Sequence, residues 1–357
     1  MDLKFLLYSG SFSERGDSVT LMSLAHLIKN HLGHDVVICI PGTSRHVSDT
    51  RVEEAKIQGI EVVRFSKKSD LDNFAVEQSI THTYVFSGGT RSSLPYFDLA
   101  TKESFRIAKT KHITHVVFRN YDFHGDAYLY VSDWLFKAAR PRLLLKKWFA
   151  KLFPAIAPRA PKLIDAFPHF VDTSTLLGTG LLLRKRLGIP ADARVLGRIG
   201  GFTEFSDPAA KQGVKRILDL SEDNYAIFVN TKEYFSHPRA FFLPALSRQA
   251  VAEFYGACDV LINGRRMGES FGYSIIEPLL LDKPVIAPHW IRNPIMDKHH
   301  ISVLKGTGLL YLGANHLVEI FKRLSTSTIP RGSYAKLASR FTPEQAAAKL
   351  KNVIELI

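Results

Sequence analysis

The feature that most constrains the fold is the alternation of short apolar runs with helix-like segments along the whole chain. In the first half, runs such as KFLLYSG, DVVICIP and THTYVFSG are separated by amphipathic stretches such as VTLMSLAHLIKNHLG. Strands that are buried on both faces of a parallel sheet have near-continuous apolar sequences, and helices connect them. The pattern therefore predicts an α/β fold built on parallel sheets.

The same pattern restarts after about residue 172, which predicts a second domain. ARVLGRIGGF, DVLING and KPVIAP are expected strands of that domain, and the preceding segment 154–175 is rich in proline, which disfavours helix. A chain of 357 residues that is 46% hydrophobic can bury two cores. We expect two doubly wound, Rossmann-like domains, residues 1–175 and 176–357, with ligands bound beyond the carboxyl ends of the strands in a cleft between them.

Composition and charge limit the class of protein. The net charge of +13 suits a phosphate-bearing partner, but no zinc finger, RNA-recognition signature or basic tail is present, so specific nucleic-acid binding is not expected. Cys39 and Cys258 both lie in apolar contexts, which argues against disulfides and thiolate metal sites, and His299-His300 has no ligand partner at a suitable spacing. Together with the absence of a signal-like or membrane-spanning run, this predicts a metal-free, cytoplasmic protein.

Two carboxylates in the apolar segment 268–278, GESFGYSIIEP, call for an explanation. Glu269 and Glu277 stand eight positions apart, and a buried carboxylate is costly unless it is paired. If a helix begins near Gly272, its free N–H groups offer a site for a diphosphate. The two carboxylates would be about 12 Å apart on a continuous helix. That distance fits a sugar nucleotide better than a glycosidase pair, whose carboxylates lie roughly 5 to 9.5 Å apart.

Several motifs resemble those of one enzyme family. Glu269-x7-Glu277, with Phe271-Gly272 inside and KPVI (283–286) behind, resembles the donor-site motif of retaining GT-B glycosyltransferases of family four. The segments 265–272 (RRMGESFG), 196–201 (LGRIGG) and 167–172 (FPHFVD) are similar to further signatures of the same superfamily. The resemblance implies a GT-B fold whose final helix, about 342–357, crosses back to the first domain. Thr342 and Gln345 would cap that helix.

The resemblance also implies an activity: transfer of a sugar from a UDP- or GDP-sugar to a hydroxyl acceptor that is a glycan, lipid-linked or small molecule. Retention of configuration and no obligatory metal are expected. Glu269 would contact the transferred sugar, Glu277 the ribose, and Arg198 the diphosphate. The expected catalytic residues are Glu269, Arg198 and His124; the expected donor-binding residues are Gly200, Gly201, Lys232, Arg265, Ser270, Phe271, Gly272, Tyr273 and Glu277; the expected acceptor-side or first-domain loop residues are Gly10, Arg15, Gly16 and Asp126.

One departure from the family pattern affects the phosphate site. The family usually has Lys-Gly about five residues after the arginine, where this chain has Gly-Phe-Thr-Glu-Phe (201–205). Lys211, Lys232 and Arg265 are the candidates for the second cation.

Other interpretations remain open at this point. The chain could be a non-catalytic GT-B-like protein that binds a nucleotide or polyanion, or a phosphorylase-like or hydrolytic enzyme. Residues 140–153, RPRLLLKKWFAKLF, form a basic amphipathic helix that could contact an anionic membrane peripherally or pack on the first domain's own core.

Overall fold

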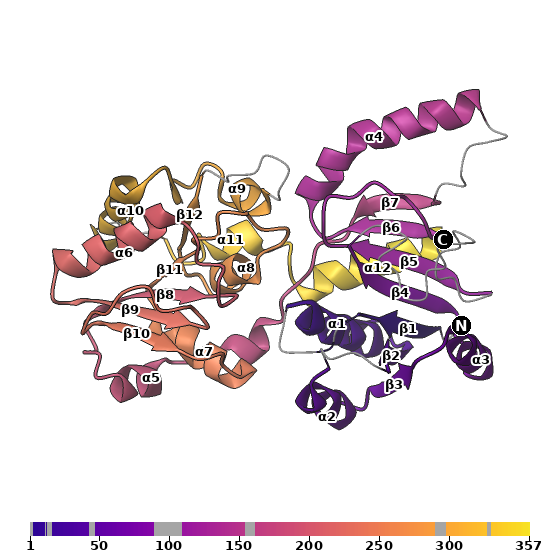
Figure 1. Ribbon diagram of the computed structural model, residues 1–357, viewed down its shortest axis with the longest axis horizontal. Coiled ribbons are helices and arrows are strands. Elements are labelled where there is room, and N and C mark those ends of the chain that lie inside the picture. Colours follow the sequence, from indigo (N-terminus) through magenta and orange to yellow (C-terminus); the bar gives the residue numbers. More distant parts are fainter. Residues whose placement is uncertain are drawn as a thin grey trace. The chain divides into compact units, whose positions relative to one another are not determined.

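Figure 1 shows a computed structural model of the chain, which describes residues 3–10, 12, 16–42, 47–88, 109–153, 161–289, 298–326 and 330–357. The chain forms two compact units. One consists of Met1–Phe170 together with Thr342–Ile357, and the other of Val171–Phe341. Each unit has a parallel sheet of its own, so the prediction of two Rossmann-like α/β domains is confirmed.

The first unit is built on a seven-stranded parallel sheet of order β3-β2-β1-β4-β5-β6-β7. Its strands are β1 (Lys4–Tyr8), β2 (Asp35–Pro41), β3 (Glu61–Phe65), β4 (His82–Ser87), β5 (Lys111–Val116), β6 (Ala127–Tyr130) and β7 (Leu163–Ala166). Its helices are α1 (Gly16–His26), which continues into the π-helical η1 (Leu27–His31), α2 (Asp49–Ile57), α3 (Lys68–Glu77), α4 (Asp133–Leu152) and α12 (Pro343–Leu356). The strand order reverses between β1 and β4.

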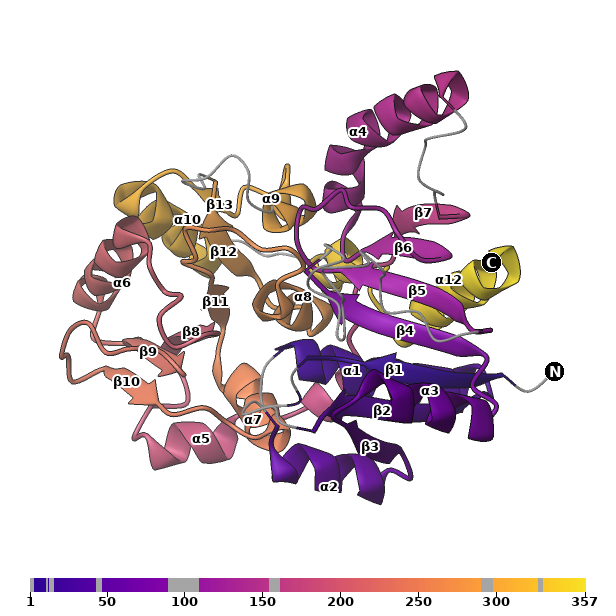
Figure 2. The same cartoon turned by 45° about the vertical axis from the view of Figure 1, so that its right-hand side comes forward.

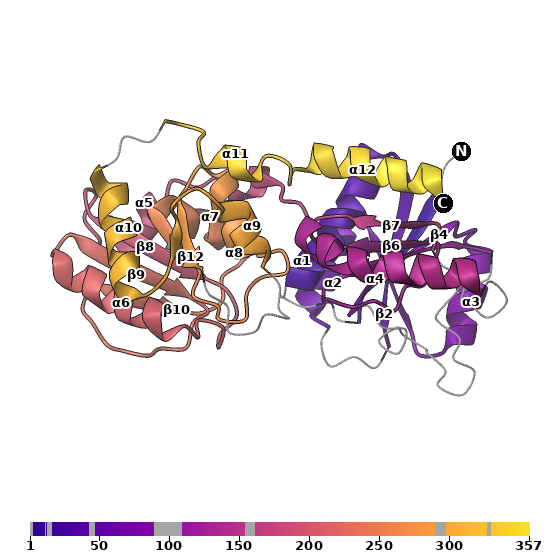
Figure 3. The same cartoon turned by 90° about the horizontal axis from the view of Figure 1, so that it is seen from above.

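The C-terminal helix α12 belongs to this first unit, as the resemblance implied. Leu350 and Val353 are buried in the same apolar core as Phe5 of β1 and Ile38 of β2. Lys349 adds an ion pair to Asp165 of β7 at 3.4 Å. Figure 3 shows α12 running along the sheet. Apolar burial therefore holds the end of the chain on the domain where the chain began.

The second unit is built on a six-stranded parallel sheet of order β10-β9-β8-β11-β12-β13. Its strands are β8 (Arg194–Ile199), β9 (Asn224–Val229), β10 (Ala240–Leu243), β11 (Val260–Ile262), β12 (Val285–Pro288) and β13 (Leu310–Tyr311). Its helices are η3 (Thr173–Leu176), α5 (Leu181–Arg186), α6 (Pro208–Leu220), α7 (Arg248–Ala257), α8 (Tyr273–Leu280), α9 (His299–Leu304), α10 (Ala314–Thr326) and α11 (Ala335–Ala338). α6 packs beside α10, and α5 beside α7 (Figure 2).

The order of this second sheet reverses between β8 and β11. Open parallel sheets bind their ligands beyond the carboxyl ends of the strands at such a reversal, because the connections on either side diverge to opposite faces. The residues that follow β8 and β11 therefore occupy the place where a ligand is expected. No helix in the described ranges is long and apolar enough to cross a membrane.

Candidate functional site

The predicted donor-site residues of the second unit gather at the carboxyl edge of its sheet. Arg198 is the penultimate residue of β8, and Gly200 and Gly201 follow directly. Arg265 and Glu269 lie in the loop between β11 and α8. The reversal of strand order thus brings together two segments that are far apart in the sequence.

Arg198 is a buried cation with a fixed orientation. Only 4% of the residue is exposed. Its Nη1 donates to Thr231 Oγ1 at 2.6 Å and to the Asn230 carbonyl at 3.1 Å, while Nη2 donates to the Gly201 carbonyl at 2.9 Å. Burial lowers the pKa of Arg198 to about 10, and the nearby carboxylates of Glu204 and Glu269 oppose that shift. The guanidinium therefore remains charged at neutral pH and is held in place before any ligand arrives.

Glu269 is a buried carboxylate held by two donors. Asn263 Nδ2 donates to Oε1 at 2.9 Å, and Arg265 Nη1 lies 3.0 Å from Oε2. Burial raises the pKa of Glu269, whereas Arg265 and Asn263 act to lower it. Arg265, which the sequence analysis lists as a candidate phosphate ligand, thus partly offsets the unfavourable burial of this carboxylate.

Gly272 fixes where α8 begins. It has a positive φ of 80° and immediately precedes Tyr273, the first residue of the helix, as predicted. A Cβ at this position would lie 3.0 Å from both Cβ and Cγ of Glu269. Glycine therefore serves two purposes, the left-handed turn and the close approach of the Glu269 side chain to the start of the helix.

Glu204 is a member of the site that the sequence prediction missed. Its Oε1 lies 3.1 Å from Arg265 Nη2, and its Oε2 accepts a hydrogen bond from Gly201 N at 3.3 Å. A Cβ at Gly201 would come within 2.6 Å of the Glu204 carboxyl carbon. The available signal was the departure from the family pattern: a carboxylate stands in the stretch where that pattern has a lysine.

Glu277 lies on α8 and is also paired within the second unit. Arg248 Nη1, from the start of α7, lies 2.5 Å from Oε1, and the buried hydroxyl of Tyr255 donates to Oε2 at 2.7 Å. Arg248 Nε also donates to Thr175 at 3.3 Å. Neither Arg248 nor Tyr255 stood out in the sequence, because their partner is 29 and 22 positions away.

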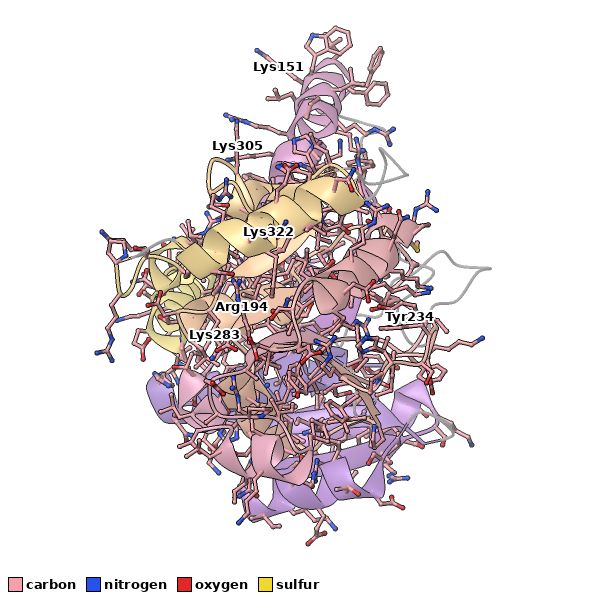
Figure 4. The ribbon with its side chains drawn as sticks, turned by 90° about the vertical axis from the view of Figure 1, so that its left-hand side faces the viewer. Lys151, Arg194, Tyr234, Lys283, Lys305 and Lys322 are labelled. Carbon is pink, nitrogen blue, oxygen red and sulfur yellow. The ribbon has the colours of Figure 1, made fainter. Side chains whose placement is uncertain are left out.

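The remaining donor-site candidates differ in their surroundings. Phe271 is buried and stacks on His299 with ring centroids 5.5 Å apart, while Ser270 and Tyr273 are half-buried. Lys232 is exposed, and the described residues show no ion pair or hydrogen bond to its ammonium group. Lys211 lies over the ring of Tyr234 at 5.1 Å; Tyr234 is labelled in Figure 4. Of the three candidate second cations, only Arg265 is seen to contact Glu269.

The candidates in the first unit do not all come together. Gly10 follows β1 at the carboxyl edge of the sheet, Gly16 opens α1, and Arg15 lies outside the described residues. His124 and Asp126 immediately precede β6. The His112 N–H, near the start of β5, donates to Asp126 Oδ2 at 2.8 Å. His124 Nδ1 donates to the Asp122 carbonyl at 2.5 Å. This pair therefore lies at the amino edge, because the loop after β5 returns along the sheet before it reaches His124.

No group of three or more His, Cys, Asp or Glu side chains within the described ranges could hold a metal ion. The adjacent His299 and His300 are instead engaged with backbone carbonyls. His299 Nδ1 lies 2.7 Å from the Phe271 carbonyl, and His300 Nε2 lies 3.1 Å from the Pro288 carbonyl.

Comparison with known proteins identifies solved structures with a similar fold. No protein-family model and no curated protein sequence matches the chain. Among solved structures, a glycosyltransferase from Rickettsia africae ESF-5 is 14% identical with a TM-score of 0.69, over 99% of this chain and 97% of that chain. Anabaena Alr3699/HepE in complex with UDP-glucose is 14% identical with a TM-score of 0.71, over 99% of this chain and 100% of that chain.

The lipopolysaccharide outer core galactosyltransferase WaaB, in its apo form, is 11% identical with a TM-score of 0.60, over 98% of both chains. At identities this low, the likeness shows the fold alone. The two Rossmann-like units of this chain are those of the GT-B fold, which confirms the predicted fold class.

Proposed function

We propose that the protein is a retaining glycosyltransferase that transfers a sugar from a nucleotide-sugar donor to a hydroxyl acceptor without an obligatory metal ion. One observation carries the proposal. At the strand-order reversal of the second sheet, a buried and oriented Arg198 lies with Arg265, Glu269 and the start of α8. Structural neighbours over the whole chain include glycosyltransferases, and HepE was solved with UDP-glucose, so a UDP-sugar is the first donor to test and a GDP-sugar the second.

In this proposal, the cationic side chains take the role that a metal has in other transferases. The donor diphosphate binds between Arg198, Arg265 and the positive end of α8, with Lys232 as a further cation. Negative charge grows on the phosphate as the bond to the sugar breaks, and oriented positive groups stabilise that charge more than they stabilise the bound donor.

The same proposal assigns the carboxylates to the sugar. Glu269 accepts hydrogen bonds from the hydroxyls of the transferred sugar, with Ser270, Phe271 and Tyr273 around it, and Glu277 lies towards the ribose. The acceptor oxygen bonds to the anomeric carbon on the face from which the nucleotide departs, and the leaving phosphate takes the acceptor's proton. Gly10, Arg15 and Gly16 are assigned to the acceptor side. His124 and Asp126 receive no role, because they lie at the amino edge of their sheet.

Donor binding is the first test of this function. A ligand that binds only the folded chain stabilises it in proportion to ln(1 + [L]/Kd) and so raises its unfolding temperature. We expect a shift with one of UDP, GDP or ADP and a larger one with its sugar. A shift without any transfer or donor hydrolysis would support the non-catalytic nucleotide-binding protein instead. The absence of any shift would contradict both the transferase and the nucleotide-binding protein.

The substitution Glu269→Gln tests the site itself. The amide keeps the size of the side chain but removes the charge, so transfer should slow by about 10² to 10³ although the chain still binds the nucleotide. Glu222→Gln, in an exposed turn before β9, is the matched control and should leave the rate unchanged. Full transfer activity in the Glu269 variant would contradict the assignment.

A further inference from the structure

The outer half of α4 leaves a row of apolar side chains exposed. In the first half of the helix, Leu135, Ala139 and Leu143 are buried against the first unit. Beyond Leu143 this changes. Six apolar residues at the end of the helix are between 40% and 63% exposed: Leu144, Leu145, Trp148, Phe149, Leu152 and Phe153. Packing on the first domain's own core therefore accounts for only the first half of this helix, which extends away from the sheet in Figure 1.

Basic side chains flank this apolar row. At 100° per residue, Leu144 to Leu152 of the row fall within an arc of roughly 140°. Arg140 and Lys151 fall along one side of this arc, and Lys137 falls just inside the same edge, one to two turns before Leu144. All three are exposed, and Lys151 is near the outer end of α4 (Figure 4). The single acidic residue of α4 is Asp133, at its first position.

Two other cations of α4 are turned towards the body of the first unit and anchor the helix there. The Arg142 guanidinium lies over the ring of Tyr121 at 4.2 Å, and Lys146 Nζ donates to the Tyr121 carbonyl at 2.9 Å. These contacts fix the rotation of the helix about its axis. The apolar row and its basic flank therefore face away from the loop that holds Tyr121.

We propose that the outer half of α4, Leu144–Phe153, docks on the surface of an anionic lipid bilayer. An apolar face with Trp and Phe beside Lys and Arg is the pattern of helices that lie in the membrane interface. Each Lys or Arg near an anionic leaflet strengthens binding about fivefold, and the net charge of +13 favours the approach of the whole chain. If the proposed function holds, docking brings a lipid-linked hydroxyl acceptor to the enzyme.

Vesicle co-sedimentation of the full chain tests the docking without requiring catalysis. We expect binding to phosphatidylcholine vesicles that contain phosphatidylglycerol and much weaker binding to pure phosphatidylcholine. Replacing Leu145, Trp148 and Phe149 together by Ser should abolish binding. Replacing Lys137, Arg140 and Lys151 together by Gln should weaken binding to the anionic vesicles about 100-fold. The matched control replaces Leu177, Leu181 and Leu182 of the second unit by Ser, since these are 65% to 74% exposed, and should bind like the wild type.

A spectroscopic readout locates the contact. The chain has three tryptophans, Trp134, Trp148 and Trp290. With Trp134→Phe and Trp290→Phe, Trp148 becomes the only reporter, and its emission should shift to the blue when anionic vesicles are added. Circular dichroism of each variant establishes that it is folded.

Three results would overturn the docking proposal. The first is unchanged vesicle binding by the apolar triple variant, and the second is equal binding to neutral and anionic vesicles. The third is a dimer that forms without lipid and that the apolar triple substitution dissociates. Such a dimer would assign this face to a second copy of the chain. Vesicle binding without any response to nucleotides would instead contradict the proposed function and leave the docking standing.

Discussion

At the scale of single residues, Arg265 lies between two carboxylates, Glu204 and Glu269. Glu204 also accepts from the Gly201 N–H. A guanidinium and a backbone N–H are the groups that a donor phosphate would use in the proposed site. In the proposed site Glu204 and the donor phosphate compete for the same two groups. The phosphate must displace the Glu204 carboxylate or bind despite its repulsion.

We expect Glu204→Gln to bind the nucleoside diphosphate about three- to tenfold more tightly, because removing a partly exposed charge of this kind changes binding by roughly 1 kcal/mol. Isothermal titration with the nucleotide identified by thermal shift measures the effect. Glu222→Gln, which removes an equal charge away from the site, should bind like the wild type. Weaker binding by the Glu204 variant would show that this carboxylate supports the site rather than competing in it.

The pairing of Glu277 is expected to stabilise the fold in addition to any role in binding. Its carboxylate is buried between Arg248 and the Tyr255 hydroxyl. An amide in its place presents an N–H group to one of two donors, so Glu277→Gln should lower the free energy of unfolding by about 1 to 3 kcal/mol. Urea denaturation measures this loss, and the exposed Glu222→Gln again serves as the control. An unchanged unfolding free energy would mean that the pairing contributes little and that the carboxylate serves mainly a ligand.

At the scale of elements, the sequence predicted what depends on local pattern. Continuous apolar runs predicted the parallel strands, and α8 begins beside Gly272, the start that the expected diphosphate site required. The features that the sequence did not predict depend on contacts between residues far apart in the chain. The donors to Glu277 come from another helix, and the amphipathic pattern of α4 does not say how much of its apolar face the domain covers. The return of the loop before β6 likewise left His124 at an unexpected edge.

The start of α8 offers a test at this scale. Gly272→Ala places a Cβ 3.0 Å from Glu269, whereas Gly188→Ala, at a similar positive φ of 67°, meets no atom within 4 Å. Both variants should lose about 1 kcal/mol of stability from backbone strain. Only the Gly272 variant should also lose transfer activity, since it displaces Glu269, and a steady-state assay separates the two. Equal activity in both would contradict the idea that the close approach positions the carboxylate.

At the scale of the whole molecule, each unit has its own sheet and core, and several histidines are buried within them. Burial lowers the pKa of His82 and of His300 to about 4 and that of His115 to about 3. The Tyr84 hydroxyl lies 2.8 Å from His115 Nδ1, which suits a neutral ring. All three residues therefore favour the uncharged form in the folded chain.

These shifts predict that the protein loses stability in acid. Above the ordinary histidine pKa of about 6.5, the folded and unfolded states are both neutral at these sites and nothing changes. Below it, the unfolded chain binds protons that the folded chain excludes until pH approaches 3 to 4, so each histidine removes up to about 1.4 kcal/mol per pH unit. Glu269, whose pKa is raised by burial, opposes this trend in part.

Urea denaturation from about pH 7.5 to about pH 5 should show the decline in the free energy of unfolding. His115→Gln should make the decline shallower, while the exposed His31→Gln leaves it unchanged. A wild-type stability that stays flat across this range would contradict the prediction.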